Sequence, residues 1–323
     1  MGFQRMFSWL LTLVLILVTV AGCKAPEPTP EPTALELVPQ DANLIANIQV
    51  SKIISDRDFR HAYDRTEKEP GQPQTVEEAL NELVKETGID LRDFSQAVVF
   101  ADVTTLEQAG YLGFVVEGTF DEEQFINDIE EKAEEEFTTS DYKGYKLYID
   151  KKEEFGITFL SDKILLLGTT KAVKDAINVS KGERQQLSGT LLDTYNRLGD
   201  ALVKFAVEFP EEAWKAITEE NVPSDIPISV EAFARMDIIG FALNKEAETI
   251  TVRISPHFVS TDFAQDARDT LSGAIMLFKG TVQVPEVKEL LRKIEVTVTD
   301  SWVTVALNIT LSEVETLIET LQQ

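Results

Sequence analysis

The chain has 323 residues, with 30 Lys and Arg against 56 Asp and Glu, so its formal net charge is −26. This excess of carboxylates excludes a general nucleic-acid binder, because phosphate recognition requires a basic surface. Hydrophobic residues make up 43% of the chain, which is enough for an ordinary globular core. The length predicts about two domains.

The N-terminus has the composition of an export signal. A single cation, Arg5, precedes an uncharged run from Met6 to Gly22 that is rich in Leu and Val. The run ends in Val20-Ala21-Gly22-Cys23, which closely resembles the lipobox of bacterial lipoproteins. The resemblance implies that residues 1–22 are a signal peptide that is removed, and that Cys23 carries acyl chains such as palmitate.

An uncleaved transmembrane helix is the alternative, because the uncharged run approaches the roughly 20 residues that span a bilayer. Both interpretations place the rest of the chain outside the cytoplasm, with Arg5 on the inner side. With lipidation, the protein would be extracytoplasmic and anchored through its lipid to the bacterial cell membrane. Two or more acyl chains give lasting anchorage. A strongly acidic body is repelled by an anionic bilayer, so we expect it to stand off the surface.

Cys23 is the only cysteine, which excludes an internal disulfide and a thiolate metal site. After it, proline occupies alternate positions from Pro26 to Pro32. Such a sequence forms neither helix nor sheet, and ten residues of polyproline II would reach roughly 30 Å. We therefore interpret residues 23–37 as the lipidated cysteine and a Pro-rich tether. A disordered leader without a role is the alternative.

Hydrophobic periodicity predicts two units, residues 38–185 and 186–323. For the first unit it predicts a strand over 44–50, helices over 52–65 and 75–88, strands over 96–103 and 111–118, a helix over 121–137, strands over 145–149, 155–160 and 163–168, and a helix over 171–179. For the second it predicts a helix over 190–198, a strand over 201–209, a segment over 211–219, strands over 232–243 and 249–258, a helix over 262–279, strands over 294–299 and 302–309, and a final helix. Capping boxes open two of these helices, Thr75-Val76-Glu77-Glu78 and Thr310-Leu311-Ser312-Glu313.

The two halves can be aligned by their element order. Thr119-Phe120-Asp121 falls on Ser260-Thr261-Asp262, and residues 172–177 fall on residues 313–318. We therefore predict an α+β fold of two similar β-α-β-β-α-β-β-α units, with mostly antiparallel sheets covered by helices. From Val38-Pro39-Gln40-Asp41-Ala42 onward, the chain also resembles an uncharacterised class of bacterial extracytoplasmic proteins that repeat such units. That resemblance implies no activity.

Catalytic motifs are scarce in the sequence. Phosphate-cradling loops, the paired-histidine zinc helix and the Gly-x-Ser-x-Gly elbow are absent from it. Of the two histidines, His61 lies among charged residues of a predicted helix and is interpreted as solvated or ion-paired. Ser255 and His257 could share a strand face as nucleophile and base. Pro256 between them, and the lack of an evident orienting acid, favour a strand end instead.

Two further clusters have both a structural and a binding interpretation. Nine acidic residues and one Lys132 lie between Asp121 and Glu136, which indicates a solvated helix face. Weak cation association and partner docking are the alternatives. Cation binding would be weak, because a selective calcium site needs a loop with a glycine turn, which this run lacks. Tyr142, Tyr145 and Tyr148 could stack on a sugar or ligand ring, although tyrosine is common on strands merely because it packs well there.

The two sheets differ in their hydrophobic pattern. Ile250, Val252 and Ile254 alternate with polar residues, and so do residues 294–299, which predicts one wet face for the second sheet. Apolar runs at 98–100, 114–116 and 164–167 lack alternation and predict that both faces of the first sheet are covered. The cover could be the protein's own helices or other half, or the face could be a groove for a lipid.

We therefore expect a non-catalytic, membrane-anchored binding or scaffold protein of the cell envelope that uses no cofactor and binds no nucleic acid. Its partners would be the membrane, through the lipid on Cys23, and an envelope protein or a hydrophobic ligand. A carrier of a lipid or other hydrophobic ligand is the first alternative. A hydrolase that uses carboxylates between the halves is the second.

Overall fold

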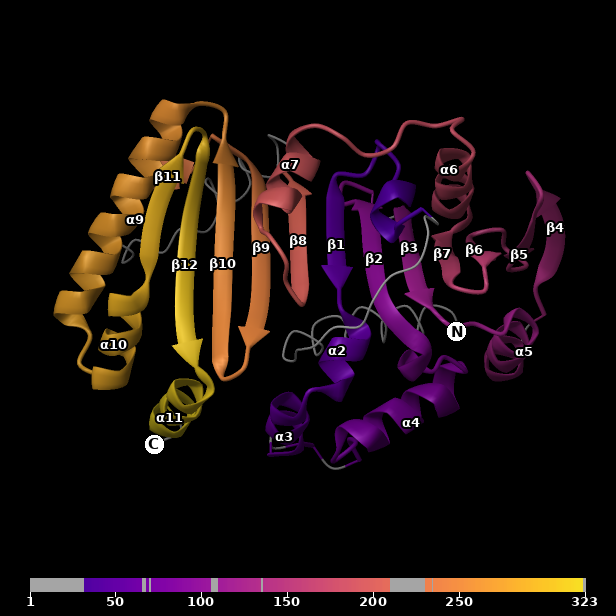
Figure 1. The fold of residues 1–323 in the computed structure, drawn as a ribbon, viewed down its shortest axis with the longest axis horizontal. Helices are drawn as coiled ribbons and strands as arrows, with labels where there is room; N and C mark the ends of the chain where they lie inside the picture. Colours follow the sequence, from indigo (N-terminus) through magenta and orange to yellow (C-terminus); the bar gives the residue numbers. More distant parts are fainter. Residues whose placement is uncertain are drawn as a thin grey trace. The chain divides into compact units, whose positions relative to one another are not determined.

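A computed structural model describes residues 32–65, 68–69, 71–105, 110–134, 136–209, 230–233 and 235–321. The chain forms two compact units that divide between Leu187 and Ser188 (Figure 1). Each unit combines helices with an antiparallel sheet, so the predicted α+β class is confirmed.

The sheet of unit 1 has the strand order β1-β2-β3-β7-β6-β5-β4. Its strands are β1 (Leu44–Ile48), β2 (Phe94–Asp102), β3 (Tyr111–Gly118), β4 (Thr138–Tyr142), β5 (Tyr145–Ile149), β6 (Phe155–Ser161) and β7 (Ile164–Thr169). Its helices are η1 (Ala34–Leu37), α2 (Val50–Ser55), α3 (Arg57–Arg65), α4 (Val76–Thr87), η2 (Leu91–Asp93), α5 (Glu122–Ala133) and α6 (Thr170–Ser180). The last of these, α6, lies against β3, β6, β7 and η1.

The central strands of unit 1 are buried on both faces, as their unbroken apolar runs predict. On β3 the adjacent Val115 and Val116 point to opposite faces and are at most 2% exposed, and on β7 the adjacent Leu165 and Leu166 are at most 1% exposed. The Phe100 ring lies over Gly113, where a Cβ atom would come within 2.1 Å of its Cζ. Glycine at this position of β3 therefore makes room for the aromatic ring.

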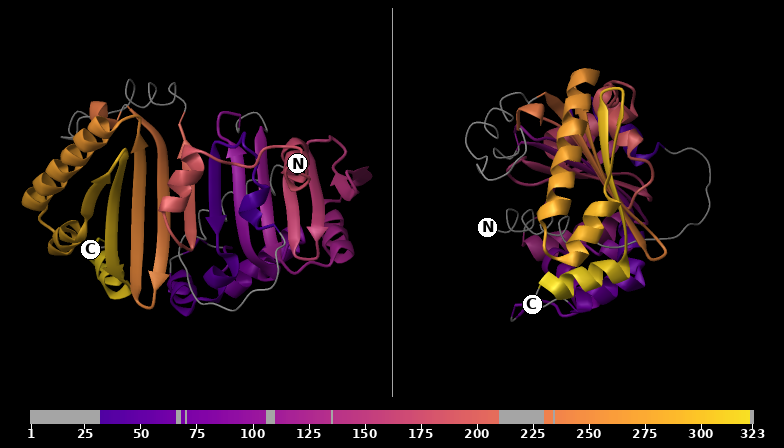
Figure 2. Two further views of the ribbon diagram at one scale, coloured as in Figure 1. Left: turned by 45° about the horizontal axis from the view of Figure 1, so that its top comes forward. Right: turned by 90° about the vertical axis from the view of Figure 1, so that its left-hand side faces the viewer.

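The sheet of unit 2 has the strand order β11-β12-β10-β9-β8. Its strands are β8 (Val203–Glu208), β9 (Met236–Glu246), β10 (Thr249–Phe258), β11 (Glu295–Thr299) and β12 (Trp302–Thr310). Its helices are α7 (Thr190–Arg197), η4 (Val230–Phe233), α9 (Thr261–Thr281), α10 (Pro285–Lys293) and α11 (Leu311–Leu321). The long helix α9 packs on the sheet, and α10 turns back from its C-terminal end (Figure 2).

The core of unit 2 is smaller and one sheet face is wet. Phe258 and Val303 are fully buried against Ala264 and Ala267 of α9. Along β11, exposed Glu295, Thr297 and Thr299 alternate with half-buried valines. The predicted alternation is therefore confirmed for this strand. For β10 it is not, because residues 250–254 are all half-buried and Ser255, expected on the wet face, is buried.

The two sheets share a strand order. In unit 1 the first three strands run in chain order, and the hairpin β6-β7 joins β3 through β7. In unit 2 the first three strands also run in chain order, and the hairpin β11-β12 joins β10 through β12. In unit 2, α10 directly precedes the hairpin β11-β12 and α11 follows it. In unit 1, α5 precedes the further strands β4 and β5, and α6 follows β7.

Several predicted boundaries differ from the structure. The helix predicted over 52–65 is broken at Asp56, because its carboxylate accepts hydrogen bonds from the backbone N–H groups of Asp58 and Phe59 and starts a new helix. The helix predicted to reach residue 137 ends at Ala133, and the next residue, Glu134, has φ +54°. The strand predicted from residue 232 begins at Met236, after η4. The segment 211–219 lies outside the described residues.

Besides the short 3-10 helices, one strand and one α-helix were not predicted. β4 has the sequence Thr-Thr-Ser-Asp-Tyr, which lacks apolar alternation, and it forms through its backbone pairing with β5. The nine-residue α10 begins with Pro285 in its first turn and has no fully buried residue.

Candidate functional site

The predicted lipidation residue, Cys23, lies outside the described residues, as do the signal segment and most of the tether. The described part shows where the tether joins the body. Its last four predicted residues are not extended but form η1, in which Ala34 and Leu37 are fully buried. The tether prediction was therefore too long, because these apolar side chains pack into unit 1.

Ser255 and His257 lie on β10, and the acid that the sequence did not reveal is Asp237 on β9. The Asp237 carboxylate is 2.6 Å from Nδ1 of His257. Antiparallel pairing places Ile238 opposite His257, and the register shifts between His257 and Phe258. Twenty residues separate the acid from the histidine along the chain, so only the strand register brings them together.

Trp302 of β12 completes this cluster. It lies opposite His257 in the strand pairing, with the two ring centroids 4.4 Å apart. The Arg197 guanidinium lies 3.8 Å from the centroid of the Trp302 ring, and the indole N–H donates to Thr194 Oγ1 at 3.2 Å. Both Thr194 and Arg197 belong to α7, so the cluster holds this helix against the face of the sheet on which Ser255 and His257 lie.

Further contacts fix α7 in the same place. The Arg253 guanidinium of β10 donates to the Leu198 carbonyl at 2.7 Å, at the C-terminal end of the helix. A Cβ on Gly240 of β9 would lie 3.1 Å from side-chain atoms of Leu198 and Thr194. The helix therefore approaches β9 at the point where the sheet has no side chain.

The arrangement does not assemble a nucleophile and a base. The Ser255 side chain is buried, with 3% of the residue exposed, and its hydroxyl lies 3.4 Å from the Thr304 hydroxyl. A substrate carbonyl would have to reach this oxygen through the packed sheet and α7. Asp237 thus orients the His257 imidazole, as an acid does in a catalytic site. The imidazole, however, lies beside Trp302 and α7 rather than in an open cleft. We interpret the cluster as a packing site.

The tyrosines of the β4–β5 hairpin are occupied by the protein's own side chains. The ammonium of Lys181 lies 4.1 Å from the Tyr145 ring centroid, and that of Lys146 lies 4.6 Å from the Tyr148 ring centroid. The Tyr148 hydroxyl donates to Glu122 at 2.6 Å, and burial followed by this carboxylate raises the pKa of Tyr148. These rings pack against lysines and do not form a free stacking platform.

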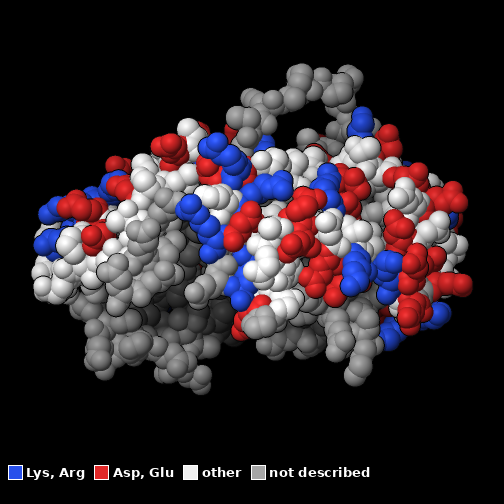
Figure 3. All heavy atoms as spheres, turned by 90° about the horizontal axis from the view of Figure 1, so that it is seen from below, with Lys and Arg blue, Asp and Glu red and all other residues white. Residues whose placement is uncertain are grey.

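The acidic run forms most of α5, with Asp121 as its cap. The Asp121 carboxylate accepts the Gln124 backbone N–H at 3.0 Å. Ile126 and Ile129 are buried, and the carboxylates project from the other side of the helix. Figure 3 shows dense Asp and Glu side chains at its right-hand end, where α5 lies. In the described part of the chain, no group of three or more His, Cys, Asp or Glu could hold a metal ion.

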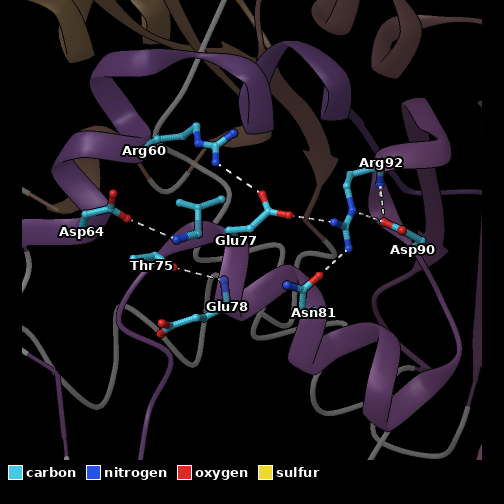
Figure 4. Close-up of polar contacts among 9 residues, drawn as sticks. Arg60, Asp64, Thr75, Glu77, Glu78, Asn81, Asp90 and Arg92 are labelled. Carbon is cyan, nitrogen blue, oxygen red and sulfur yellow. Dashed lines mark hydrogen bonds and ion pairs between the residues drawn. The ribbon is translucent and has the colours of Figure 1, made fainter.

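An ion-pair network joins the helices of unit 1 near His61. Glu77 of α4 lies between Arg60 of α3, at 3.4 Å, and Arg92 of η2, at 2.8 Å (Figure 4). Arg92 also donates to Asp90 at 2.7 Å. His61 is exposed on α3. Exposed networks of this kind contribute little stability, and nothing here forms a reactive centre.

The lipid-groove hypothesis requires an open apolar face on the first sheet. Phe114, Leu165 and Leu167, on β3 and β7, are all at least nine-tenths buried. The Phe94 and Phe120 rings pack edge to face, and Phe120 contacts Phe159 in the same way. These described side chains therefore leave no broad apolar face in contact with solvent. Among the described residues, no helix combines the length and apolarity needed to cross a membrane.

The chain matches no family model. Over 146 residues it is 28% identical to MJ0635, an uncharacterized protein of Methanocaldococcus jannaschii. This match covers 44% of the chain and 49% of that protein, so the chain spans about half the length of the curated relative. Among solved structures, crystal form III of TP0453 has 9% identity and a TM-score of 0.47, covering 91% of this chain and 100% of that one. Crystal form IV has 10% identity and a TM-score of 0.47, covering 88% and 96%. At these levels of similarity we infer neither a family nor an activity.

Proposed function

We propose that this protein is a lipoprotein held outside the cytoplasm by acyl chains on Cys23, with a non-catalytic body that binds or supports another component of the cell envelope. The observation that carries the proposal is the sequence Val20-Ala21-Gly22-Cys23 at the end of an uncharged run, with the chain's single cysteine at the required position. The Pro-rich segment that follows separates the lipid from the folded body.

The way the body begins supports an anchoring role. The Ala34 backbone N–H donates to the Glu117 carboxylate of β3 at 2.9 Å. The Leu187 backbone N–H donates to the Val38 carbonyl at 2.8 Å. Because both ends of the η1 segment are hydrogen-bonded to unit 1, the end of the tether is fixed to the folded body.

We also propose that the body arose by duplication. The support is the strand order, because β1-β2-β3-β7-β6 and β8-β9-β10-β12-β11 follow the same path in their sheets. Unit 1 also has the hairpin strands β4 and β5, which have no counterpart among the described residues of unit 2. A body of two such units offers two sheets and several helix faces for binding.

A binding role is favoured over catalysis by the packing of the one His–Asp pair on β10 and β9. The Ser255 residue beside it is buried, the Trp302 ring contacts the imidazole, and the Arg197 guanidinium lies over the Trp302 ring. The polar contacts that the structure shows for this cluster therefore join one strand to another or to α7.

Metabolic labelling with a radioactive fatty acid tests the anchor. The unaltered chain should take up label in its native host, and Cys23→Ala should lose it, because no other thiol is present. Thr29→Ala, within the tether, is the matched control and should label normally. Intact-mass analysis should show an acylated chain that begins at Cys23. A bare thiol with the leader still attached would contradict the proposal.

A further inference from the structure

The C-terminal end of α9 exposes three consecutive large apolar side chains. Met276 is 75% exposed, Leu277 47% and Phe278 37%. We call these three residues the apolar tip. Soluble proteins scatter single apolar residues over their surfaces, but a contiguous exposed group marks a site of interaction.

The helix cannot bury this group against its own sheet. The side of α9 that faces the core carries Ala264, Ala267 and Ala274. From Ile275 to Phe278 every residue is apolar, and successive residues point about 100° apart around a helix. Four such residues surround the helix axis, so part of the group must face away from the sheet. Its exposure follows from the sequence and requires no distortion.

The charge around the tip differs from that of the whole chain. The chain has a net charge of −26, yet residues 270–285 contain no Asp or Glu and one cation, Lys279. The neighbouring α10, which packs against α9, adds Glu286 and Glu289 but also Lys288, Arg292 and Lys293. The opposite end of α9 provides a contrast. Val259 is 57% and Phe263 38% exposed there, but Asp262, Asp266 and Asp269 lie in the same stretch of chain. Apolar exposure and an excess of cations over carboxylates in α10 and the end of α9 therefore coincide in this part of unit 2.

We propose that the apolar tip of α9 inserts into the interfacial layer of a lipid bilayer. The acidic body is repelled by an anionic membrane, so contact is favoured where cations outnumber carboxylates and a lysine can reach the headgroups. The inference rests on the proposed function, because the anchor at Cys23 keeps the body near the bilayer and makes a small contact sufficient.

A second copy of the chain fits the tip less well. A stable interface buries roughly 800 Å² on each partner, and three side chains at the end of one helix supply only a small part of that area. Insertion of a few apolar side chains into a bilayer needs no matching protein surface, and each buried CH₂ group contributes separately. The small size of the tip therefore favours the membrane.

A fluorescent label at the tip tests the contact in the full chain. Cys23→Ala removes the native thiol, and Leu277→Cys then carries an environment-sensitive fluorophore. The uncharged segment Met6 to Gly22 is retained and holds the chain on vesicles of phosphatidylcholine and phosphatidylglycerol. The label should shift its emission to shorter wavelength and be quenched by brominated acyl chains. Lys279→Glu should lower the equilibrium constant for contact at least about fivefold on these vesicles.

Val259→Cys in the same Cys23→Ala chain is the matched control, because it places the label on an exposed apolar position among carboxylates. Its emission should stay as it is in solution. Equal emission from the two labels on vesicles would overturn the proposal. So would a shift of the Leu277 label that needs no vesicles and grows with protein concentration, since that indicates a second copy.

Circular dichroism establishes that each variant folds, and an unfolded tip variant is replaced by Met276→Cys, the most exposed of the three positions. The outcome is separable from that of the anchor proposal. All these chains lack the Cys23 thiol, so a failure of lipidation in the native host leaves the fluorescence result unchanged.

Discussion

Glu313 shows how much a single residue of the sequence can reveal. The predicted capping box at Thr310-Leu311-Ser312-Glu313 is confirmed, because the Thr310 backbone N–H donates to the Glu313 carboxylate at 2.9 Å and the Glu313 N–H donates to Thr310 Oγ1 at 3.3 Å. The box at Thr75 is only half formed. Glu78 N–H donates to Thr75 Oγ1, but the Glu78 carboxylate accepts from the backbone of Gln74. Local patterns such as these need no tertiary information.

The tertiary partner of Glu313 was not predictable from the sequence. The Lys293 ammonium, at the end of α10, donates to the same carboxylate at 2.6 Å. This contact, followed by the Thr310 N–H, lowers the pKa of Glu313 from its ordinary value of 4.5 to about 2. Glu313 therefore joins the start of α11 to the end of α10.

Replacing Glu313 should reduce the pH dependence of the free energy of unfolding at acid pH. A carboxyl whose pKa is lower in the folded state contributes fully above its unfolded pKa, and the contribution is lost as the pH falls through about 2. Glu313→Gln cannot ionise, so its free energy of unfolding should fall less steeply with pH below about 4.5 than that of the unaltered chain. Urea unfolding at a series of pH values measures this, with exposed Glu295→Gln as the control. Parallel profiles for the unaltered chain and Glu313→Gln would contradict the assignment.

At the scale of elements, apolar runs predicted the central strands of unit 1, and periodicity predicted the long helices, because these residues are buried in the interior of their unit. It missed β4, whose five residues carry no apolar pattern and which exists through backbone pairing alone. It also missed α10, although Pro285 in its first turn was a usable start signal. For the candidate site, alternation placed Ser255 and His257 on one face. The role of Asp237 could not be predicted from the sequence, because its position beside His257 depends on the register of β9 with β10.

Two glycines should respond in opposite ways to alanine, because their elements surround them differently. A Cβ at Gly113 of β3 would lie 2.1 Å from Cζ of the buried Phe100, so Gly113→Ala should destabilise unit 1 by about 1–3 kcal/mol. Gly273, exposed in α9, has no atom within 4 Å of an added Cβ. Gly273→Ala should stabilise the helix by about 0.5–1 kcal/mol. Urea midpoints of both variants measure the two effects, and a loss of stability at Gly273 would contradict the open environment described for α9.

At the scale of the whole molecule, the units share a strand order but differ in how completely they are packed. Most of the largest fully buried side chains belong to unit 1, among them Phe100, Leu165 and Leu166, whereas Phe258 and Leu198 represent unit 2. Composition and periodicity predicted two units of α+β structure. They could not predict this imbalance, because burial depends on which helices cover each sheet face, and α10 has no fully buried residue.

Hydrogen exchange should therefore reveal two levels of protection. Local stability follows the buried apolar contacts around a strand, so segments with fewer of them open at lower free energy. On β10, Ile250, Val252 and Ile254 are only half-buried, whereas on β7 Leu165 and Leu166 are at most 1% exposed. Amides of β10 and β12 should exchange before those of β3 and β7, although all four are inner strands of their unit's sheet. Mass spectrometry of peptides from a quenched time course measures this order. Equal protection of the four strands would mean that the chain opens as one cooperative unit, and the difference in packing would then have no consequence for stability.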